Sequence, residues 1–257
     1  DADIIVITSS ADLTDWAQAK TTKPLILDVV DGLIGEQNPV KDFVRGVGHM
    51  NSHHTSSFKL KKFSDTLMLV AKNCNSVICS SLEQVQEWRK HGVKAFDILD
   101  FHEEIPRALG CIENSEKNSD SLFWEGLPPT IQSMTLLKLL KSGDHSRPYT
   151  LNVLTKLEYY KYMNRYIKLD VLRILEKQID SKSIKINLME WTPDNLVEWA
   201  NNSSIGVIPI QGFKGYNHLK AENRLLIMWR LGLPVLTSAL PSYVRTMKDA
   251  GIPGICH

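Results

Sequence analysis

The sequence lacks the features that mark several specialised classes of protein. Its 257 residues include only four cysteines and no C-x-x-C pair, so a zinc site built on cysteines is not expected. No apolar run approaches the roughly 18–20 residues that a membrane span requires. No G-x-G-x-x-G follows a predicted strand, which argues against a dehydrogenase or a nucleotide-sugar epimerase.

An excess of charge of one sign is also missing. Lys and Arg number 30 and Asp and Glu number 29, which gives a formal net charge of +1. Nucleic-acid binding needs a basic stripe, and the one tight basic run, at 59–62, is explained more simply as the solvated side of a loop or helix. We therefore expect no nucleic-acid partner.

The cysteines point to a reducing environment. Cys74 and Cys79 flank an apolar segment and are expected to be small buried side chains, a usage that suggests a cytoplasmic protein. The sequence starts at Asp1 without an initiator Met and stops at His257 within an expected strand or turn, so we expect it to be incomplete at both ends.

The sequence as a whole has the composition of a globular protein, and its pattern is that of an α/β fold. Hydrophobic residues make up 43% and charged residues 23%, and this length suits one large or two ordinary domains. Buried strands alternate with helices in both halves, which predicts parallel sheets. The strands are expected at 3–10, 24–32, 76–81, 95–100, 121–126, 149–155, 183–191 and 205–210.

Two polar segments interrupt this alternation. Residues 112–121 hold no large apolar group after Ile112, which predicts a linker between an N-terminal domain, 1–111, and a C-terminal domain, 122–257. Residues 33–58 predict a long irregular connection. Helices are expected at 13–20, 59–73, 82–91, 128–140 and 166–179. Three more are expected from the Thr192 cap to Ala200, from Lys220 to the stop at Gly232, and from Pro241 to Gly251.

The most informative stretch runs from Lys220 to Ser238, with a predicted helix, a glycine stop and a short strand. Its first turn carries Lys220, Asn223 and Arg224. Cations at a helix amino terminus oppose the helix dipole, so an anionic ligand explains them better than a solvated turn does. Lys220 and Arg224 are four residues apart and are expected on one helix face. Asn223 is interpreted equally well as a phosphate ligand or as a cap.

The second half resembles the carboxyl-terminal domain of GT-B glycosyltransferases. The resemblance covers about 130 residues in the right order, and the first half resembles the acceptor domain more weakly, through Asp28-x-x-Asp31-Gly32 and strand 76–81. The segments that carry it are Phe123-Trp124-Glu125-Gly126, Glu190-Trp191 with the helix and strand that follow, Lys220-Ala221-Glu222-Asn223-Arg224, and Leu231-Gly232-Leu233-Pro234-Val235.

This resemblance implies two facing Rossmann-like domains with a cleft between them. It also implies transfer of a sugar from a nucleotide-diphosphate donor, with UDP or GDP, to a hydroxyl of an unidentified acceptor. The implied diphosphate ligands are Gly126, Lys220, Asn223 and Arg224, and the implied nucleotide ligands are Trp191 and Glu222. A tight turn at Gly126 and a core position for Trp191 are the alternatives.

One position departs from the pattern. Many retaining GT-B enzymes have a ribose-binding glutamate five residues before the glycine of Gly-x-Pro, and here Ile227 occupies that position. A non-catalytic GT-B-like nucleotide- or protein-binding module is therefore the alternative function.

A base is needed beside the acceptor hydroxyl, and the candidates lie in the first half. We expect Asp31 and His49 in this role, with Asp28, His53, His54 and His102 as further candidates. No Asp-x-Asp stands at a strand end to clamp a metal–diphosphate complex. The prediction is a metal-independent reaction without a cofactor, in which the nucleotide sugar is the substrate.

Overall fold

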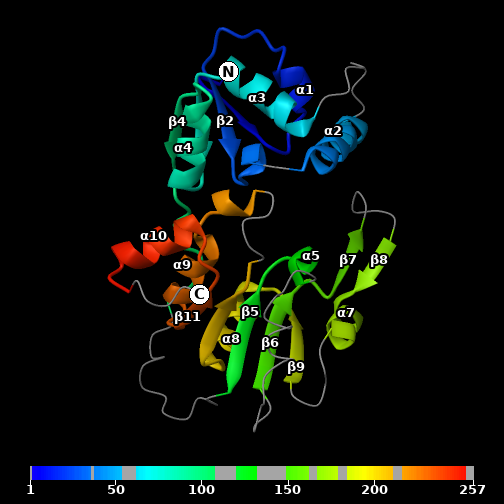
Figure 1. The fold of residues 1–257 in the computed structure, drawn as a ribbon, viewed down its shortest axis with the longest axis vertical. Coiled ribbons are helices and arrows are strands. Elements are labelled where there is room, and N and C mark those ends of the chain that lie inside the picture. The colour runs from blue at the N-terminus through cyan, green and yellow to red at the C-terminus, as the bar shows by residue number, and fades with distance from the viewer. Residues whose placement is uncertain are drawn as a thin grey trace. The chain divides into compact units, whose positions relative to one another are not determined.

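The computed structural model describes residues 2–35, 38–53, 62–107, 120–131, 149–161, 167–178, 184–210 and 216–252. The chain divides into two compact units. Unit 1 comprises residues 1–100, 212–222 and 240–246, and unit 2 comprises residues 101–211, 223–239 and 247–257. Each unit is built on a parallel sheet (Figure 1). The predicted linker lies almost wholly outside the described residues, and the division at residues 112–121 stays a prediction.

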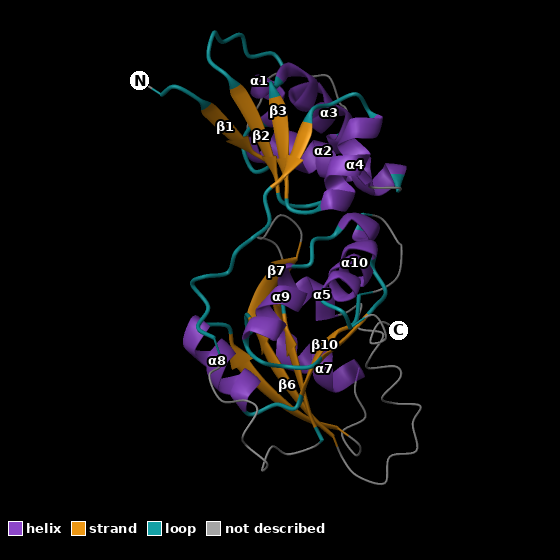
Figure 2. Cartoon of the chain, turned by 90° about the vertical axis from the view of Figure 1, so that its left-hand side faces the viewer, coloured by secondary structure: helices purple, strands orange, loops and turns teal. Residues whose placement is uncertain are grey.

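Unit 1 has a four-stranded parallel sheet in the order β1-β2-β3-β4. The chain moves through the sheet in one direction, so right-handed crossovers place the connecting helices on one face, as Figure 2 shows. The strands are β1 (Ile5–Thr8), β2 (Leu25–Val29), β3 (Ser76–Cys79) and β4 (Ala95–Asp97), and the helices are α1 (Leu13–Trp16), α2 (Pro39–His53), α3 (Phe63–Asn73) and α4 (Leu82–Lys90).

Alternate strand residues supply the core of unit 1. Leu25, Leu27 and Val29 point to the helical face and are buried, while Ile26 and Asp28 between them are half-buried. The same period of two is expected for a strand whose two faces differ in burial. The predicted strands of this half are confirmed, although each is shorter than its apolar run.

Helix α2 corrects the prediction of an irregular connection at 33–58. The two glycines at 46 and 48 disfavour a helix, but tertiary contacts compensate. The buried carboxylate of Asp42 accepts a hydrogen bond of 3.0 Å from the Ser64 backbone N–H at the start of α3 and another from the Ser64 hydroxyl. These hydrogen bonds hold α2 against α3. Because they join residues far apart in sequence, the periodicity of the sequence alone does not reveal them.

A later segment of the chain completes unit 1. The short 3-10 helix η2 (Asn217–Leu219) brings Leu219 against Gly32, where a Cβ would lie 2.3 Å from the Leu219 Cβ. The Leu219 carbonyl accepts hydrogen bonds from Gln84 Nε2 at 3.0 Å and Ser81 Oγ at 3.4 Å. The glycine and these two donors fix the backbone just before Lys220.

Unit 2 has a five-stranded parallel sheet in the order β11-β10-β5-β6-β9. From β5 the chain builds outward through β6 and β9, then returns to the other side of β5 for β10 and β11. The order therefore reverses between β5 and β10. The strands are β5 (Ser121–Glu125), β6 (Tyr149–Thr155), β9 (Ile184–Glu190), β10 (Ile205–Ile208) and β11 (Val235–Thr237).

The helices of unit 2 pack on this sheet around a core that includes Trp124, Leu151, Val153 and Leu175. Gly206 allows α9 to approach β10 closely, since a Cβ there would lie 2.5 Å from the Met228 sulfur. The helices are α5 (Pro128–Ile131), α7 (Val171–Gln178), α8 (Pro193–Asn201) and α9 (Asn223–Arg230); α10 (Pro241–Asp249) spans residues of both units.

The helix predicted at 166–179 is shorter in the structure. Helix α7 begins only at Val171, because the segment before it forms an antiparallel hairpin of β7 (Glu158–Lys161) and β8 (Ile167–Asp170). The prediction of a helix at 128–140 is confirmed for α5, and residues 132–140 lie outside the described residues. In the described parts of the chain, no helix has the length and apolar character needed to cross a membrane.

Candidate functional site

The carboxyl ends of β5 and β10 mark the switch point of the unit 2 sheet, where open α/β sheets usually bind ligands. Strand β5 ends at Glu125, and Gly126 follows with φ 154°. The Gly126 N–H donates to the Leu154 carbonyl at 3.2 Å, and its carbonyl accepts from Thr155 Oγ1 at 2.6 Å. The N–H of Gly126 is thus engaged within the sheet, and a role of Gly126 toward a diphosphate stays a prediction.

Gly126 contributes space rather than a donor. A Cβ at this position would lie 2.7 Å from Arg224 Nη2 and 2.9 Å from Arg224 Cζ. The guanidinium therefore rests against the glycine backbone, and its carbon lies 6.0 Å from the centre of the Trp124 ring. The structure brings two of the predicted diphosphate ligands, Gly126 and Arg224, together.

A buried carboxylate fixes the other side of Arg224. Glu125 is 8% exposed, and its Oε1 lies 3.6 Å from Arg224 Nε. The side chain of Trp191 donates a hydrogen bond to the same carboxylate. Burial raises the pKa of Glu125 above its ordinary value, although Arg224, the Trp191 hydrogen bond and His102 all act in the opposite direction. Sequence analysis did not single out Glu125, although a charged residue that ends a buried strand is a signal of function.

His102 belongs to the same cluster. It has a positive φ of 51°, which is uncommon for a residue with a side chain. Its Nδ1 lies 3.6 Å from Glu104 Oε1, and its buried Nε2 has no hydrogen-bond partner among the described residues. Arg230 holds this segment by donating from Nη2 to the Glu103 carbonyl at 3.2 Å and from Nε to the Ile105 carbonyl. The prediction had placed His102 in the acceptor domain, whereas it lies in unit 2.

Trp191 directly follows β9. Its backbone N–H donates to the Thr155 carbonyl at 3.0 Å, and the residue is 41% exposed. Part of its ring is therefore accessible, unlike that of Trp124, which is 2% exposed and belongs to the core. The exposure argues against the alternative of a core tryptophan.

Helix α9 begins at Asn223 rather than at Lys220. Lys220 has extended backbone dihedrals at the end of η2, and its carbonyl accepts a hydrogen bond from Ser242 Oγ at 2.6 Å. The prediction that Lys220 and Arg224 share a helix face is therefore wrong. Asn223 is the first residue of α9 and is half-buried. The roles of Lys220 and Asn223 toward a diphosphate stay predictions.

Glu222 is engaged within unit 1. It is 1% exposed, and its Oε1 accepts from Arg245 Nη2 at 3.0 Å and from Thr246 Oγ1 at 3.2 Å. Arg245 in turn forms a two-pronged pair with Glu83, at 2.9 and 3.1 Å. This buried ion-pair network gives Glu222 a structural explanation, and a contact with a nucleotide stays a prediction.

The two predicted catalytic residues lie in unit 1. Asp31 is exposed just after β2, near the carboxyl edge of that sheet. His49 lies in α2, where its Nε2 accepts a hydrogen bond of 3.1 Å from the Leu13 N–H and its ring packs edge-on against Phe63. That bond uses the Nε2 lone pair, so the geometry supports a structural role for His49 more directly than a catalytic one. Among the other candidates, Asp28 is the fourth residue of β2 and His53 is the last residue of α2, while His54 lies outside the described residues.

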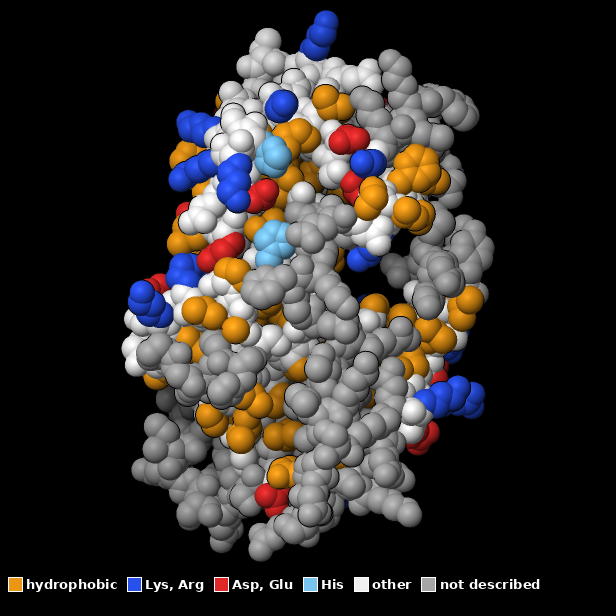
Figure 3. Space-filling view, viewed as in Figure 1, with side chains coloured by type: hydrophobic (Ala, Val, Ile, Leu, Met, Phe, Trp, Pro, Cys, Tyr) orange, Lys and Arg blue, Asp and Glu red, His pale blue; other side chains and the backbone are white. Residues whose placement is uncertain are grey.

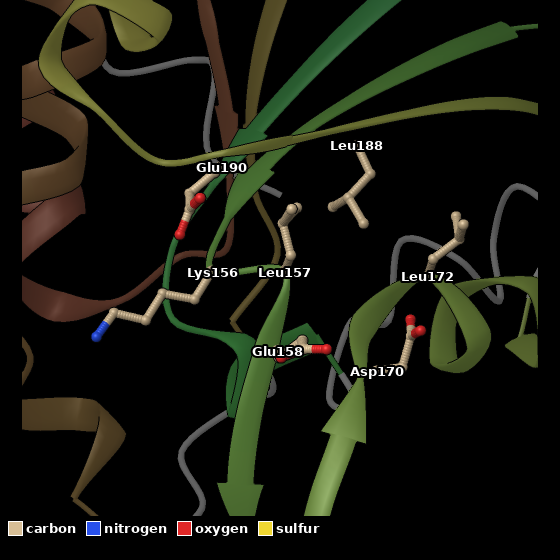
Figure 4. A pocket seen from close by; sticks show the side chains of 7 residues that line it. All are labelled: Lys156, Leu157, Glu158, Asp170, Leu172, Leu188 and Glu190. Atoms are coloured by element: carbon tan, nitrogen blue, oxygen red, sulfur yellow. The ribbon is translucent and has the colours of Figure 1, made fainter.

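A pocket of about 610 Å³ opens beside the ends of β6 and β9 (Figure 4). Three leucines line it, and three carboxylates and one lysine stand around them. Glu158 is also paired with Lys168 at 2.6 Å, and Asp170 accepts from the Arg173 N–H at the start of α7. The lining residues are Lys156, Leu157, Glu158, Asp170, Leu172, Leu188 and Glu190. Glu190, the last residue of β9, immediately precedes Trp191 in the chain.

Basic side chains gather over β4 and α4 of unit 1 (Figure 3). Arg89 Nη2 donates to the Ala95 carbonyl at 2.9 Å, Lys90 pairs with Glu87 at 2.8 Å, and Lys94 lies over the Phe96 ring. Each of these cations thus has a local partner. The patch is explained as a solvated surface whose cations have a carboxylate, a backbone carbonyl and an aromatic ring as partners.

Cys74 and Cys79, the cysteines of the described ranges, are both at least partly buried. Burial raises the pKa of Cys74 to about 11, and burial with the nearby carboxylates of Asp97 and Asp28 raises the pKa of Cys79 to about 12. Both thiols are therefore poor nucleophiles at neutral pH. Within the described ranges, no three His, Cys, Asp or Glu side chains are grouped as metal ligands would be.

Comparison with known proteins gives little further information. No protein-family model and no curated protein matches the chain. Among solved structures, the glycosylation-associated protein (Gap123) complex from Streptococcus agalactiae is similar over 98% of this chain, with 11% identity and a TM-score of 0.43. The chain spans about half of that neighbour, 48% of its length. At this level the match carries no argument about function.

Proposed function

We propose that unit 2 binds the diphosphate of a nucleotide sugar and that the protein transfers the sugar to an acceptor hydroxyl. The observation that carries the proposal is the guanidinium of Arg224, which rests against Gly126 at the switch point of the sheet. Resemblance of the second half to GT-B donor domains led to the same two residues.

Arg224 is well suited to bind a diphosphate. A guanidinium presents five N–H donors in a planar fork that matches two phosphate oxygens. Its Nε faces Glu125 at 3.6 Å, and 22% of the side chain remains accessible. Gly126, Glu125 and Trp124 restrict its motion, so less side-chain entropy is lost when an anion binds. Its place in the first turn of α9 adds the helix dipole to the same anion.

The nucleoside is expected to follow the sheet edge from Arg224 toward the pocket. The accessible ring of Trp191 offers a stacking surface for a base, and the neighbouring Glu190 lines the pocket with a carboxylate that accepts hydrogen bonds from hydroxyl groups. In this arrangement Glu190 takes the place of the ribose-binding glutamate that is absent at Ile227.

The reaction breaks the bond between the sugar C1 and the diphosphate oxygen and forms a bond from C1 to the acceptor oxygen. Negative charge grows on the leaving diphosphate, so a fixed cation beside it lowers the barrier. Arg224 supplies that charge without a metal. The acceptor hydroxyl must lose its proton. Of the two predicted bases, the exposed Asp31 is the one we propose for this step, because the Nε2 of His49 already accepts a hydrogen bond from the Leu13 N–H.

The test separates binding from transfer. Calorimetric titration with UDP-glucose and with GDP-mannose should show binding of one of them. The variant Arg224→Gln should weaken it about tenfold or more, a loss typical of a charge-assisted contact. The matched control is Arg173→Gln, an exposed arginine of α7 in the same unit, which should bind normally.

Release of the nucleoside diphosphate in the presence of candidate acceptors then tests catalysis. Release that depends on an acceptor and falls in Arg224→Gln supports a glycosyltransferase. Binding without any release supports the non-catalytic module. Failure of both nucleotide sugars to bind, with the fold intact, contradicts the proposal.

A further inference from the structure

Glu125 and a bound diphosphate would compete for the same cation. The single positive charge of Arg224 now faces the Glu125 carboxylate, 3.6 Å from its Nε. A diphosphate at the accessible side of Arg224 brings two further negative charges beside a carboxylate that is only 8% exposed. Like charges in a poorly solvated site cannot all remain ionised at low cost.

We infer that Glu125 takes up a proton when a diphosphate binds at Arg224, so that affinity for the nucleotide sugar rises as the pH falls. In this exchange a proton from solvent bonds to a Glu125 oxygen, and the Arg224 guanidinium changes partner from carboxylate to phosphate. No other bond is made or broken. The inference rests on the proposed function and assigns Glu125 as the residue that positions Arg224 in the free protein.

The surroundings of Glu125 suit a carboxyl group that changes protonation. From β5 it faces Arg224 of α9, the Trp191 side chain after β9, and His102 of the segment before β5. Burial already favours the neutral acid, and Arg224 is the strongest group that opposes it. Once a phosphate shares that cation, the largest force that keeps Glu125 ionised is weakened.

His102 is a further ionisable side chain beside Glu125, and Glu104 lies 3.6 Å from its Nδ1. A proton on His102 would also favour an anion, so the two residues predict the same trend with pH. The two residues can be distinguished by the substitution that removes the pH dependence of binding. Glu125→Gln keeps an uncharged side chain of the same size and cannot take up the proton, whereas His102→Gln leaves Glu125 intact.

The experiment is calorimetric titration of the whole chain with UDP-glucose or GDP-mannose, whichever binds, from about pH 5 to about pH 8. The diphosphate of either donor has no ionisable terminal phosphate, so the probe keeps its charge over this range. Titration in two buffers with different ionisation enthalpies measures the protons taken up by the unmodified protein and therefore requires no variant. We expect net uptake of up to one proton on binding. The Kd should increase by as much as about tenfold for each unit by which the pH rises.

Each outcome separates the inference from the proposed function. Proton uptake that disappears in Glu125→Gln and persists in His102→Gln supports the inference. Binding with no proton uptake, or uptake that disappears only in His102→Gln, overturns the inference and leaves the proposed function standing. Absence of binding at every pH overturns both.

Discussion

Arg224 lies against Gly126 so closely that a Cβ on residue 126 would come within 2.7 Å of the guanidinium. The two residues belong to α9 and to the turn after β5, which are far apart in the chain. The contact places a cation at the switch point of the unit 2 sheet, and Glu125 then limits how it can move.

Replacement of Gly126 by alanine should displace Arg224 and weaken nucleotide binding. It should also cost about 1–3 kcal/mol of stability, because φ at this position suits glycine. Calorimetric binding and chemical denaturation measure the two effects. The matched control is Gly92→Ala, which has φ +75° and meets no described atom within 4 Å; it should lose stability but bind normally. Equal affinity in both variants would contradict the role of Gly126.

Glu125→Gln should alter how stability depends on pH. Because burial raises the pKa of Glu125, its contribution to stability is complete below the unfolded pKa and is lost as the pH rises through the folded pKa. The stability of the variant relative to wild type should therefore increase as the pH rises above about 4. Denaturation at a series of pH values checks this, with the exposed Glu176→Gln as control. A difference that does not change with pH would count against a raised pKa.

Arg245→Gln should destabilise the protein by about 3 kcal/mol, because it leaves the carboxylate of Glu222, 1% exposed, without its cation. The comparison is Lys168→Gln, which removes an exposed pair with Glu158 and should give no measurable change. Urea denaturation of both variants measures the two changes in the free energy of unfolding. Similar losses for the two would mean that the Arg245 network is no more stabilising than a surface pair.

Gly206→Ala should destabilise by about 1–3 kcal/mol, since the new methyl would lie 2.5 Å from the Met228 sulfur. Combination with Met228→Ala should be less destabilising than the sum of the two single changes, because the shorter side chain makes room. A double-mutant cycle by denaturation measures this coupling. In contrast, Gly48→Ala in α2 meets no described atom within 4 Å and should stabilise slightly. Additive effects at Gly206 and Met228 would show that the close approach of α9 to β10 is not limiting.

The parallel α/β architecture could be predicted because buried strands leave continuous apolar runs, as at Leu25 to Val29 and Leu151 to Leu154. The β7–β8 hairpin was missed because its second strand precedes α7 without a turn signal, so a helical pattern extended too far. The start of α9 was also misplaced. Contacts of Leu219 with Gln84 and Gly32, which are distant in sequence, hold the preceding residues in another conformation.

Two residues of the candidate site carry signals that can be recognised in the sequence alone. Gly126 and Arg224 stand out as a strand-end glycine and a helix-start cation, and each signal is local. The roles of Glu125 and His102 depend on burial and on partners from other elements, such as Trp191. Neither burial nor partner choice can be obtained from residue types at fixed spacing.

The central claim is that Arg224 binds the diphosphate of a nucleotide sugar. A crystal structure of the protein with UDP-glucose or GDP-mannose tests it most directly. The predicted result is a diphosphate oxygen within hydrogen-bond distance of an Arg224 Nη atom, beside Gly126 and in front of Glu125. A nucleotide bound elsewhere, with Arg224 still facing only Glu125, would contradict it.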